Sequence, residues 1–460
     1  MFGNIFVEGR TKPTVMKFGG TSVRDAEAFS RVAEIVSSQK EHSPIVVTSA
    51  MANVTDALLD AFEAAKRDDS SKAFSLLKMH FDRHKNIAEK LLEKPRETAF
   101  LAELNLAKEE ISSLLLRVER RSLPLQMLKD AVVSYGEQLS SRLLADVCKA
   151  KGLNARQIDA RRIIVTDDEY GSAKPIWDET AKFIQLELNS LLDAGEIPIM
   201  GGFISANRSG ETTTLGRGGS DYSAALVGAA LIAREIQIWT DVTGVLTCDP
   251  RICSDARTID VLSYNEAAEL AYFGAKVLHP KTIKPAVDYS IPVRVCNSQK
   301  PNEKGTMVLA ISEFSQNKIK SIAHKMGISI LRISSARMLG SYGFMSALFQ
   351  VFERFRTVID VISTSEVSVA LTLDNIDSLD KIVVELERLG DVEVEHGYGV
   401  ICIVGEGLRA SSGLASKIFS TIEDTNISLI SHGASSVNMT FVVKEKEVSE
   451  VIKRLHDSFF

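Results

Sequence analysis

The sequence predicts an α/β protein in which a mainly parallel central sheet is followed by two small ferredoxin-like βαββαβ modules. One observation is the succession of strand, glycine turn, helix and strand near the N-terminus, which is typical of a parallel sheet. The other is an internal repeat, because residues 425–431 resemble residues 357–363. Each copy follows an amphipathic helical pattern and precedes an alternating strand, so each copy indicates one compact module.

The first part of the chain alternates between strand and helix patterns. The apolar strand 14–18 ends in Gly19 and Gly20, and Thr21 and Ser22 are candidate caps of the following helix. Most of the chain between residues 56 and 143 has a helical pattern. The remaining elements are short strands at 45–47, 163–165, 197–204, 236–240 and 293–296, and a helix at 223–233.

The repeat divides the C-terminal part of the chain. Its predicted helices lie at 344–355 and 414–423, its inner strands at 367–373 and 437–443, and its outer strands at 328–333, 392–394 and 400–404. We therefore expect a first domain of residues 1–310, a module of residues 320–396 and a module of residues 397–460. The pattern leaves open whether the two modules exchange a strand.

Composition and charge exclude several classes of function. A net charge of −6 and an isoelectric point near 5.9 argue against a protein that binds nucleic acid or an anionic membrane surface. The five cysteines form no C-x-x-C pair, which favours free thiols over a zinc site or a disulfide framework. No apolar run has the length of a signal peptide or a membrane span. We expect a cytoplasmic protein.

The first candidate motif is Lys17-Phe18-Gly19-Gly20-Thr21-Ser22 at a predicted strand end. Glycines let a phosphate approach the backbone, and a lysine can neutralise charge on a phosphoryl group. Taken alone, this motif is better explained as a tight turn with a solvated lysine. It is not a Walker A loop, since the lysine precedes the glycines, and protein-kinase signatures are absent.

The loop of residues 212–221 is more informative, because it combines three glycines, an arginine and an acid directly before a helix. Ser220 or Asp221 is expected to cap that helix, and Arg217 to bind a carboxylate bidentately. A glycine loop closing on a capped helix explains Ser220 but not the whole combination. Residues 239–251 and 273–280 add further polar and basic side chains, although each segment alone would more often be a surface loop.

Together these motifs resemble the amino acid kinase superfamily, and within it the aspartate kinases. The matching strings occur in the order of that family and are KFGGTSV (17–23), SYGEQLSS (134–141), GRGGSDYSAA (216–225), WTDVTGVLTCDPR (239–251) and AELAYFGAKVLHP (268–280). The C-terminal repeat resembles paired ACT domains, and SEVSVALTLD (365–374) resembles the lysine-sensitive branch. The resemblance covers nearly the whole chain and implies an amino-acid-kinase-type three-layer fold.

The resemblance also implies roles for residues at matching positions. Lys17 and Asp221 are expected to be catalytic, with Asp221 orienting Lys17. Contacts with ATP are expected from Lys17, Gly19, Gly20, Thr21, Thr240, Asp241, Arg251 and Lys276. Contacts with L-aspartate are expected from Ser49, Thr55, Glu137, Arg217, Gly219 and Ser220. Among these, Glu137 would bind the α-ammonium group and Arg217 a carboxylate.

Three features depart from the pattern of the family. The segment 49–55 contains Met51 and Asn53 where the family has an S-A-S-A-G-I-T-like sequence. Leu246 replaces a tyrosine that is common after the T-D-x-x-G-x stretch. The extension before Thr14 has no role that the residues indicate.

The implied reaction transfers the γ-phosphoryl group of ATP to the side-chain carboxylate of L-aspartate and gives 4-phospho-L-aspartate. A carboxylate is already nucleophilic at pH 7, so catalysis would depend on in-line positioning and on positive charge from Lys17, Lys276 and Mg²⁺. One alternative is a sister kinase for glutamate or acetylglutamate, against which Glu137 and the paired modules count. The other is an amino-acid sensor with an inactive kinase part, against which Lys17, Arg217 and Asp221 count. A fusion to homoserine dehydrogenase is not expected, since nothing follows Phe460.

Feedback inhibition by lysine is the expected regulation. Helix N-terminal amides near Ser341 or Gly343 suit an α-carboxylate, and Asp360, within an expected run of buried strand residues 358–362, suits an ammonium group. Without the resemblance, Asp360 would equally well be a solvated edge residue. The expected lysine contacts are Met338, Ser341, Gly343, Phe344, Met345, Val358, Ile359, Asp360, Ser365 and Glu366. In lysine-sensitive relatives two chains form this site, which implies a homodimer through the ACT modules and leaves a tetramer open.

Overall fold

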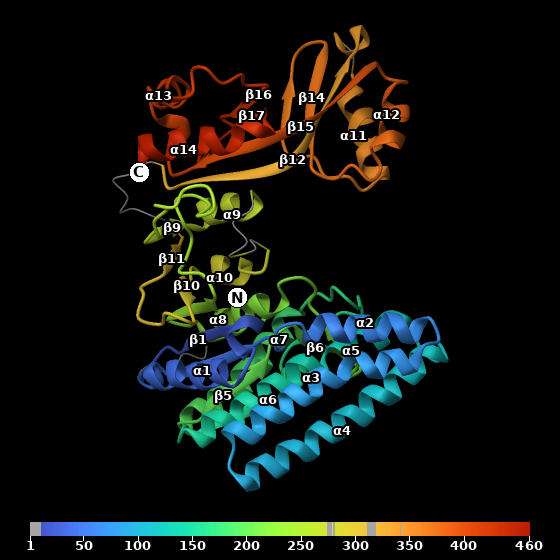
Figure 1. Ribbon diagram of the computed structural model, residues 1–460, viewed down its shortest axis with the longest axis vertical. Coiled ribbons are helices and arrows are strands. Elements are labelled where there is room, and N and C mark those ends of the chain that lie inside the picture. Colours follow the sequence, from blue (N-terminus) through green and yellow to red (C-terminus); the bar gives the residue numbers. More distant parts are fainter. Residues whose placement is uncertain (1–10, 274–277, 279–280, 311–318, 341) are drawn as a thin grey trace. The chain divides into compact units, whose positions relative to one another are not determined.

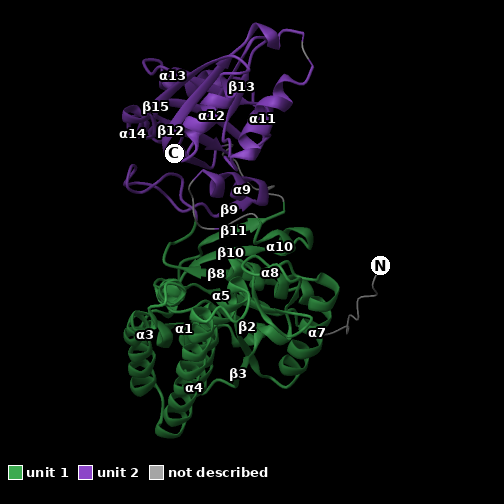
Figure 2. Cartoon of the chain, turned by 90° about the vertical axis from the view of Figure 1, so that its right-hand side faces the viewer, with its two compact units in different colours: residues 1–244, 279–310 green, residues 245–278, 311–460 purple. Residues whose placement is uncertain are grey.

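The structure is a computed structural model that describes residues 11–273, 278, 281–310, 319–340 and 342–460. The chain divides into two compact units, which are coloured separately in Figure 2. The first comprises Met1–Gly244 and His279–Ala310, and the second Val245–Leu278 and Ile311–Phe460. Residues 245–278, which were expected in the first domain, therefore belong to the same unit as the C-terminal repeat.

A mainly parallel sheet forms the centre of the first unit. Its strands are β1 (Thr14–Phe18), β2 (Pro44–Thr48), β3 (Ala155–Ile158), β5 (Ile197–Gly201), β8 (Glu235–Thr240), β10 (Val293–Asn297) and β11 (Thr306–Leu309). Within this unit they are ordered β3-β5-β2-β1-β8-β10-β11. The central strand β1 runs parallel to both β2 and β8, and β11 is antiparallel to β10. Residues on both faces of β1 and β2 are buried, as expected for parallel strands covered on both sides.

Helices cover the sheet of the first unit (Figure 1). They are α1 (Ala26–Ser38), α2 (Val54–Lys66), α3 (Ser70–Leu91), α4 (Lys94–Glu119), α5 (Leu125–Val133), α6 (Tyr135–Ala150), α7 (Trp177–Asp193), α8 (Gly219–Leu231) and α10 (Lys284–Asp288). Helix α6 packs against β2, β3 and β5, whereas α8 packs against β1, β2 and β8. The long neighbouring helices α3 and α4 share a core with α6 through Phe100, Leu104 and Leu143. The predicted α/β fold class is confirmed.

A second, smaller sheet in this unit carries the glycine-rich loop. It consists of β4 (Val165–Thr166), β6 (Ile204–Asn207) and β7 (Thr212–Thr214), in the order β4-β6-β7. The predicted strand 197–204 is therefore two strands, β5 and β6, which are separated by Gly202 and Phe203. The chain passes directly from β7 through residues 215–218 into α8, so this sheet determines where the loop begins.

The second unit contains a six-stranded antiparallel sheet in the order β13-β14-β12-β15-β17-β16. The strands are β12 (Ser321–Ser334), β13 (Ile362–Thr364), β14 (Ser368–Leu373), β15 (Asp391–Val404), β16 (Leu429–His432) and β17 (Asn438–Lys444). The helices of the repeat are α11 (Phe344–Arg354), α12 (Leu379–Leu386), α13 (Leu414–Thr421) and α14 (Val448–Phe459), and α9 (Tyr264–Tyr272) precedes them in the same unit. The sheet and its helices form two ferredoxin-like modules, as predicted.

The long strands β12 and β15 each belong to both modules. In module one, residues 328–334 of β12 pair with β14 and with the first half of β15. In module two, residues 400–404 of β15 pair with β17 and with residues 321–325 of β12. The edge strand of module two therefore comes from a segment that precedes module one in the sequence.

Three local predictions are wrong. Thr21 and Ser22 lie in a short 3₁₀ helix (Gly20–Val23), and Asp25 caps α1 instead by accepting a hydrogen bond from the Ala28 amide at 2.9 Å. Helix α8 begins directly after Gly218, so Ser220 and Asp221 lie in its first turn rather than at its cap.

The third wrong prediction is the buried strand 358–362. Strand β13 begins only at Ile362, and Val358 is 63% exposed. Before β13, the Val361 amide donates to the Thr372 hydroxyl oxygen at 2.8 Å instead of continuing the regular strand ladder. No helix in the described part of the chain combines the length and apolar character needed to cross a bilayer.

Candidate active site

A hollow of about 320 Å³ lies in the first unit where β1, β2 and the N-terminus of α8 meet, and we call it the substrate hollow. Its walls are side chains and backbone of Lys17, Ser49, Thr55, Glu137, Phe203 and residues 216–221. The structure therefore brings together both predicted catalytic residues and all six predicted aspartate contacts, which come from four separate stretches of sequence.

Lys17 and Asp221 form an ion pair at the substrate hollow. The Lys17 Nζ atom lies 2.8 Å from Asp221 Oδ1, and the two side chains are only 13% and 17% exposed. Asp221 lies in the first turn of α8, where the helix dipole stabilises a carboxylate. The pair holds the ammonium group of Lys17 at the end of β1, beside the glycine-rich loop.

The turn after β1 requires glycine at one of its two positions. A Cβ atom on Gly20 would lie 2.8 Å from the Ala50 carbonyl oxygen, closer than side chains approach in folded proteins. The Ala52 amide also donates to the Gly20 carbonyl oxygen at 3.1 Å. The contact fixes the turn against the segment that follows β2, which carries Ser49 and Thr55.

Glu137 is a buried acid in the first turn of α6, and its side chain faces the substrate hollow. Its Oε1 atom accepts a hydrogen bond from the Ala50 amide at 3.0 Å. Its Oε2 atom has no hydrogen-bond partner among the residues that the structure describes. Burial raises the pKa of Glu137 to about 8. The Oε2 atom of Glu137 is therefore available to accept a hydrogen bond from a cationic ligand group.

Gly201 allows α6 to approach the sheet this closely. A Cβ atom at that position would lie 2.9 Å from the Glu137 Cβ atom and 3.0 Å from its carbonyl oxygen. Any larger residue at the end of β5 would therefore displace Glu137 from the hollow.

The structure accounts for the unusual residues of the segment 49–55. Asn53 has φ +66° and ψ +2°, a left-handed conformation that asparagine tolerates better than most residues. The Met51 side chain is buried in the hydrophobic core, with 1% exposure, and not in the hollow. The Ser49 hydroxyl donates to the Ser220 hydroxyl oxygen at 3.0 Å, which joins this segment to α8.

Two left-handed glycines place Arg217 at the rim of the hollow. Gly216 and Gly218 have φ values of +74° and +72°, and a Cβ atom on Gly218 would lie 2.7 Å from Thr282 Cγ2. Arg217 between them is exposed. An exposed guanidinium group at the edge of a hollow can reach an anionic ligand inside it.

Asp130, which was not predicted from the sequence, lies beneath the glycine-rich loop. The buried carboxylate on α5 accepts hydrogen bonds from the Thr214 amide and the Gly171 amide, each at 2.8 Å, and from the Thr214 hydroxyl at 3.0 Å. These bonds fix the end of β7 just before the loop. An isolated acid in a helical segment carries no sequence signal of such a role.

Phe203 was also missed, although it lines the substrate hollow. Its φ of +67° is rare for an aromatic residue, and its amide donates to the Ser223 hydroxyl oxygen at 3.0 Å. The neighbouring Gly202 approaches α8 so closely that a Cβ atom there would lie 2.7 Å from Ser220 Cα. The Gly-Gly pair before Phe203 was the available signal that the strand is interrupted here.

The predicted nucleotide contacts are divided between the two units. Thr240 ends β8 in the first unit and Asp241 follows it, and the Thr240 hydroxyl donates to Asp241 Oδ1 at 3.1 Å. Arg251 belongs to the second unit, is 86% exposed and forms an ion pair with Asp249 at 2.6 Å. Lys276 lies outside the described residues. The nucleotide assignment as a whole therefore stays a prediction.

Most of the predicted lysine contacts in module one surround a second hollow, of about 490 Å³, which we call the effector hollow. Its lining residues are Met338, Leu339, Gly340, Gly343, Phe344, Met345, Ser346, Ser365 and Glu366. Ser341 lies outside the described residues. Val358, Ile359 and Asp360 are not among the lining residues, so the structure separates the predicted set into two groups.

Asp360 is buried and paired, not a solvated edge residue. Its side chain is 1% exposed and lies 3.0 Å from Lys325 Nζ, and the Tyr272 hydroxyl donates to it at 2.6 Å. Lys325 also contacts Asp374 at 2.6 Å. Burial acts to lower the pKa of Lys325, but the hydrogen bonds to Asp374 and Asp360 outweigh it and raise that pKa. The acid links β12 of the sheet to α9.

Comparisons with known proteins agree with this geometry. The amino acid kinase family matches residues 12–297, and an ACT domain matches residues 401–459. The chain is 38% identical to lysine-sensitive aspartokinase 3 of Escherichia coli over 462 residues, which cover 97% of this chain and 99% of that protein. It is also 38% identical to chloroplastic aspartokinase 1 of Arabidopsis thaliana, with 97% of this chain and 80% of that protein covered.

Two solved structures of E. coli aspartokinase III are similar to this chain throughout. The complex with aspartate and ADP, an R state, has a TM-score of 0.81 at 36% identity and covers 98% of this chain and 100% of that chain. The complex with lysine and aspartate, a T state, has a TM-score of 0.84 at 37% identity and covers 97% of this chain and 99% of that chain.

Proposed function

Since this chain belongs to the aspartokinases, within the amino acid kinase family, we propose that it transfers the γ-phosphoryl group of ATP to the side-chain carboxylate of L-aspartate. The observation that carries the proposal is Glu137, a buried acid with a vacant oxygen in the same hollow as the Lys17–Asp221 pair. The hollow thus offers an anionic group for one end of an amino acid and cationic groups for the other.

Substrate binding uses these two ends. The Glu137 Oε2 atom accepts a hydrogen bond from the α-ammonium group of aspartate, and Arg217 binds a carboxylate from the rim. Ser49, Thr55, Gly219 and Ser220 contribute hydroxyl groups and backbone to the same wall. A substrate held at both ends leaves its second carboxylate free to attack a phosphoryl group.

Catalysis depends on charge and position, because the attacking carboxylate needs no base. Lys17 stabilises negative charge on the transferring phosphoryl group, and Asp221 orients Lys17. Gly19, Gly20 and Thr21 follow Lys17 on the turn, where they contact the phosphates. Thr240 and Asp241 extend the nucleotide site of the first unit, and Arg251 and Lys276 stay predicted nucleotide contacts.

The residues of the first unit fit an Mg²⁺ ion carried by ATP. Such an ion takes most ligands from phosphate oxygens and water, and it needs only one or two carboxylates from the protein. Asp221 and the exposed Asp241 offer carboxylate oxygens of this kind. When bound, the ion neutralises negative charge on the phosphates.

Regulation by lysine is part of the proposal, and its support lies in module one. The effector hollow suits the α-carboxylate of lysine, because it contains the N-terminus of α11 at Gly343. The ammonium group of the effector competes with Lys325 and Tyr272 for Asp360. A homodimer through the ACT modules, with two chains sharing the effector site, belongs to the same proposal.

A coupled assay of ADP formation with ATP, Mg²⁺ and an acceptor tests the function. Turnover with L-aspartate and none with glutamate or acetylglutamate is the expected result. Comparable turnover with either alternative acceptor would assign the chain to a sister kinase. Absence of turnover with every acceptor, together with lysine binding to the folded protein, would favour the sensor function.

A further inference from the structure

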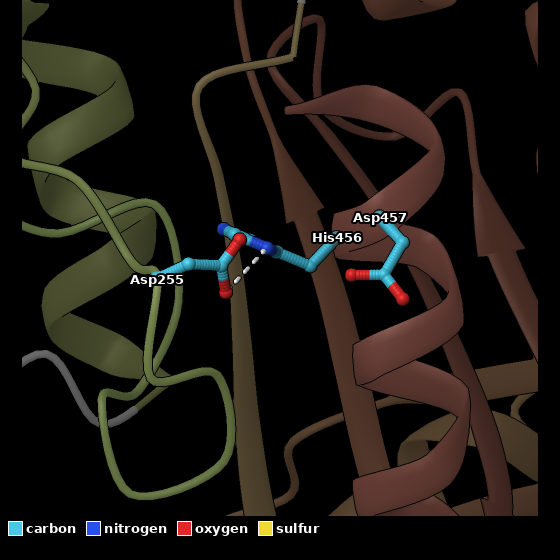
Figure 3. A group of neighbouring side chains, drawn as sticks. All are labelled: Asp255, His456 and Asp457. Atoms are coloured by element: carbon cyan, nitrogen blue, oxygen red, sulfur yellow. Dashed lines mark ion pairs between the residues drawn. The ribbon is translucent and has the colours of Figure 1, made fainter.

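Three ligand-bearing side chains meet in the second unit, and none of them lines the substrate hollow or the effector hollow. Asp255 lies on the loop after Arg251, and His456 and Asp457 lie near the C-terminal end of α14 (Figure 3). One ligand atom of each residue, a carboxylate oxygen or an imidazole nitrogen, lies within 4.8 Å of the other two. Both aspartates are exposed, whereas His456 is fully buried.

The imidazole of His456 is held in place through only one of its nitrogens. Its Nε2 atom lies 2.9 Å from the Thr247 hydroxyl oxygen, which also accepts a hydrogen bond from the Arg257 amide at 3.0 Å. Its Nδ1 atom is buried and has no hydrogen-bond partner in the described part of the chain. Leaving a buried nitrogen unpaired costs stability, so this arrangement calls for an explanation.

The Nδ1 atom is directed toward Asp255 (Figure 3). The distance from Nδ1 to Asp255 Oδ1 is 3.6 Å, which is too long for a hydrogen bond. It agrees with the separation of two ligands that each lie about 2.1 Å from one metal ion. We infer that Asp255, His456 and Asp457 form a binding site for one divalent transition-metal ion.

The donor set indicates which ions bind. One neutral imidazole and two carboxylates give a site of charge −2, which a divalent cation neutralises. A nitrogen ligand favours Zn²⁺, Cu²⁺ or Ni²⁺ over Mg²⁺ and Ca²⁺, which prefer oxygen ligands alone. Thr247 is the oxygen acceptor that fixes the imidazole ring of His456, because a ligating histidine usually donates its other N–H to such an acceptor.

Two nearby thiols are the main competitors for such an ion. Cys248 and Cys253 are buried with their Sγ atoms 2.8 Å apart. Neither thiol belongs to the group of ligand atoms that Asp255, His456 and Asp457 form. The bound ion would instead join α14 to the loop of residues 249–256, which carries Asp249 and Arg251.

Isothermal titration calorimetry of the whole chain with Zn²⁺, Mn²⁺ and Mg²⁺, without nucleotide, tests the inference. We expect one Zn²⁺ per chain and weaker binding of Mg²⁺. Asp255→Ala and Asp457→Ala should each weaken Zn²⁺ binding by about tenfold or more, since each removes a charged ligand. Asp260→Ala removes an exposed acid of the same unit and should leave the affinity unchanged.

Thermal unfolding supplies a second measurement. Zn²⁺ should raise the melting temperature of the wild type and of Asp260→Ala by several degrees, and that of Asp255→Ala by much less. The double variant Cys248→Ser/Cys253→Ser should keep the wild-type response. Absence of stoichiometric Zn²⁺ binding, unchanged affinity in both aspartate variants, or loss of binding in the serine double variant would each overturn the assignment.

Discussion

The affinity for aspartate should increase as the pH rises from 7 to 8.5, because Glu137 binds the α-ammonium group only as a carboxylate. With a pKa of about 8, this acid is ionised in only about a tenth of the ligand-free molecules at pH 7. The apparent dissociation constant is the intrinsic constant divided by the ionised fraction. That fraction rises to about three quarters at pH 8.5, so the KM for aspartate should fall about eightfold.

Steady-state kinetics at saturating ATP, with aspartate varied between pH 6.5 and 8.5, measures this change. The ammonium group of free aspartate stays protonated through this range, so the substrate itself contributes little. Calorimetry in two buffers of different ionisation enthalpy should detect release of about 0.9 proton per aspartate bound at pH 7. Glu137→Gln is the control, because it cannot ionise and should show a high, pH-independent KM.

A wild-type KM that is constant between pH 7 and 8.5, with no proton released on binding, would refute the reasoning. The raised pKa would then be unconnected with substrate binding, and the ammonium group would need another partner.

Four further predictions follow from the same contacts. Glu137→Gln should stabilise the ligand-free protein at pH 7 by up to about 3 kcal/mol in chemical denaturation. In the wild type the folded state holds a proton on Glu137 that the unfolded chain releases. The stability of the wild type therefore falls as the pH rises from the ordinary pKa of 4.5 toward 8, and the variant avoids this loss. No gain in stability would contradict the burial argument. Lys17→Ala should lower kcat about 10³-fold with a smaller change in aspartate KM, whereas Lys66→Ala, at an exposed ion pair, should leave kcat unchanged. Asn53→Gly should be nearly neutral, and Asn53→Ala should reduce the free energy of unfolding by about 1 kcal/mol, since only the alanine opposes the left-handed backbone. Equal stability of the two variants would refute that explanation. Asp360→Ala should raise the lysine concentration for half-inhibition about tenfold or more at unchanged uninhibited kcat, and wild-type activity that ignores millimolar lysine would exclude the effector site.

The parts of the fold that depend on local pattern were predictable from the sequence. Strand β1 matches its prediction residue for residue, because an apolar run between a proline and a glycine pair has few alternatives. Helix α11 also begins where the amphipathic pattern begins, at Phe344. Motifs of the substrate hollow were recognised because each combines several unusual residue types within one short stretch.

The parts that depend on contacts between distant segments were not predictable. The vacant oxygen of Glu137 requires Gly201, Ala50 and α6 to meet, and these are far apart in the sequence. Asp360 was expected to await a ligand, but Lys325 and Tyr272 already contact it from two other elements. Asp255 and His456 are about two hundred residues apart in the sequence, and no sequence motif indicates that they lie close together in space.

The way β12 and β15 pass through both modules affects how the chain can be dissected. Module one is a guest inserted into module two, because residues 321–325 and 400–404 belong to one sheet half and lie on either side of it. A chain that ends after residue 396 would leave the first half of β12 without its partner, and a chain that begins after residue 327 would expose the flank of module two. Neither module can therefore be removed by a single cut without leaving an open sheet edge, a surface prone to aggregation. Cutting on both sides of module one and rejoining the ends is the dissection that would preserve its host.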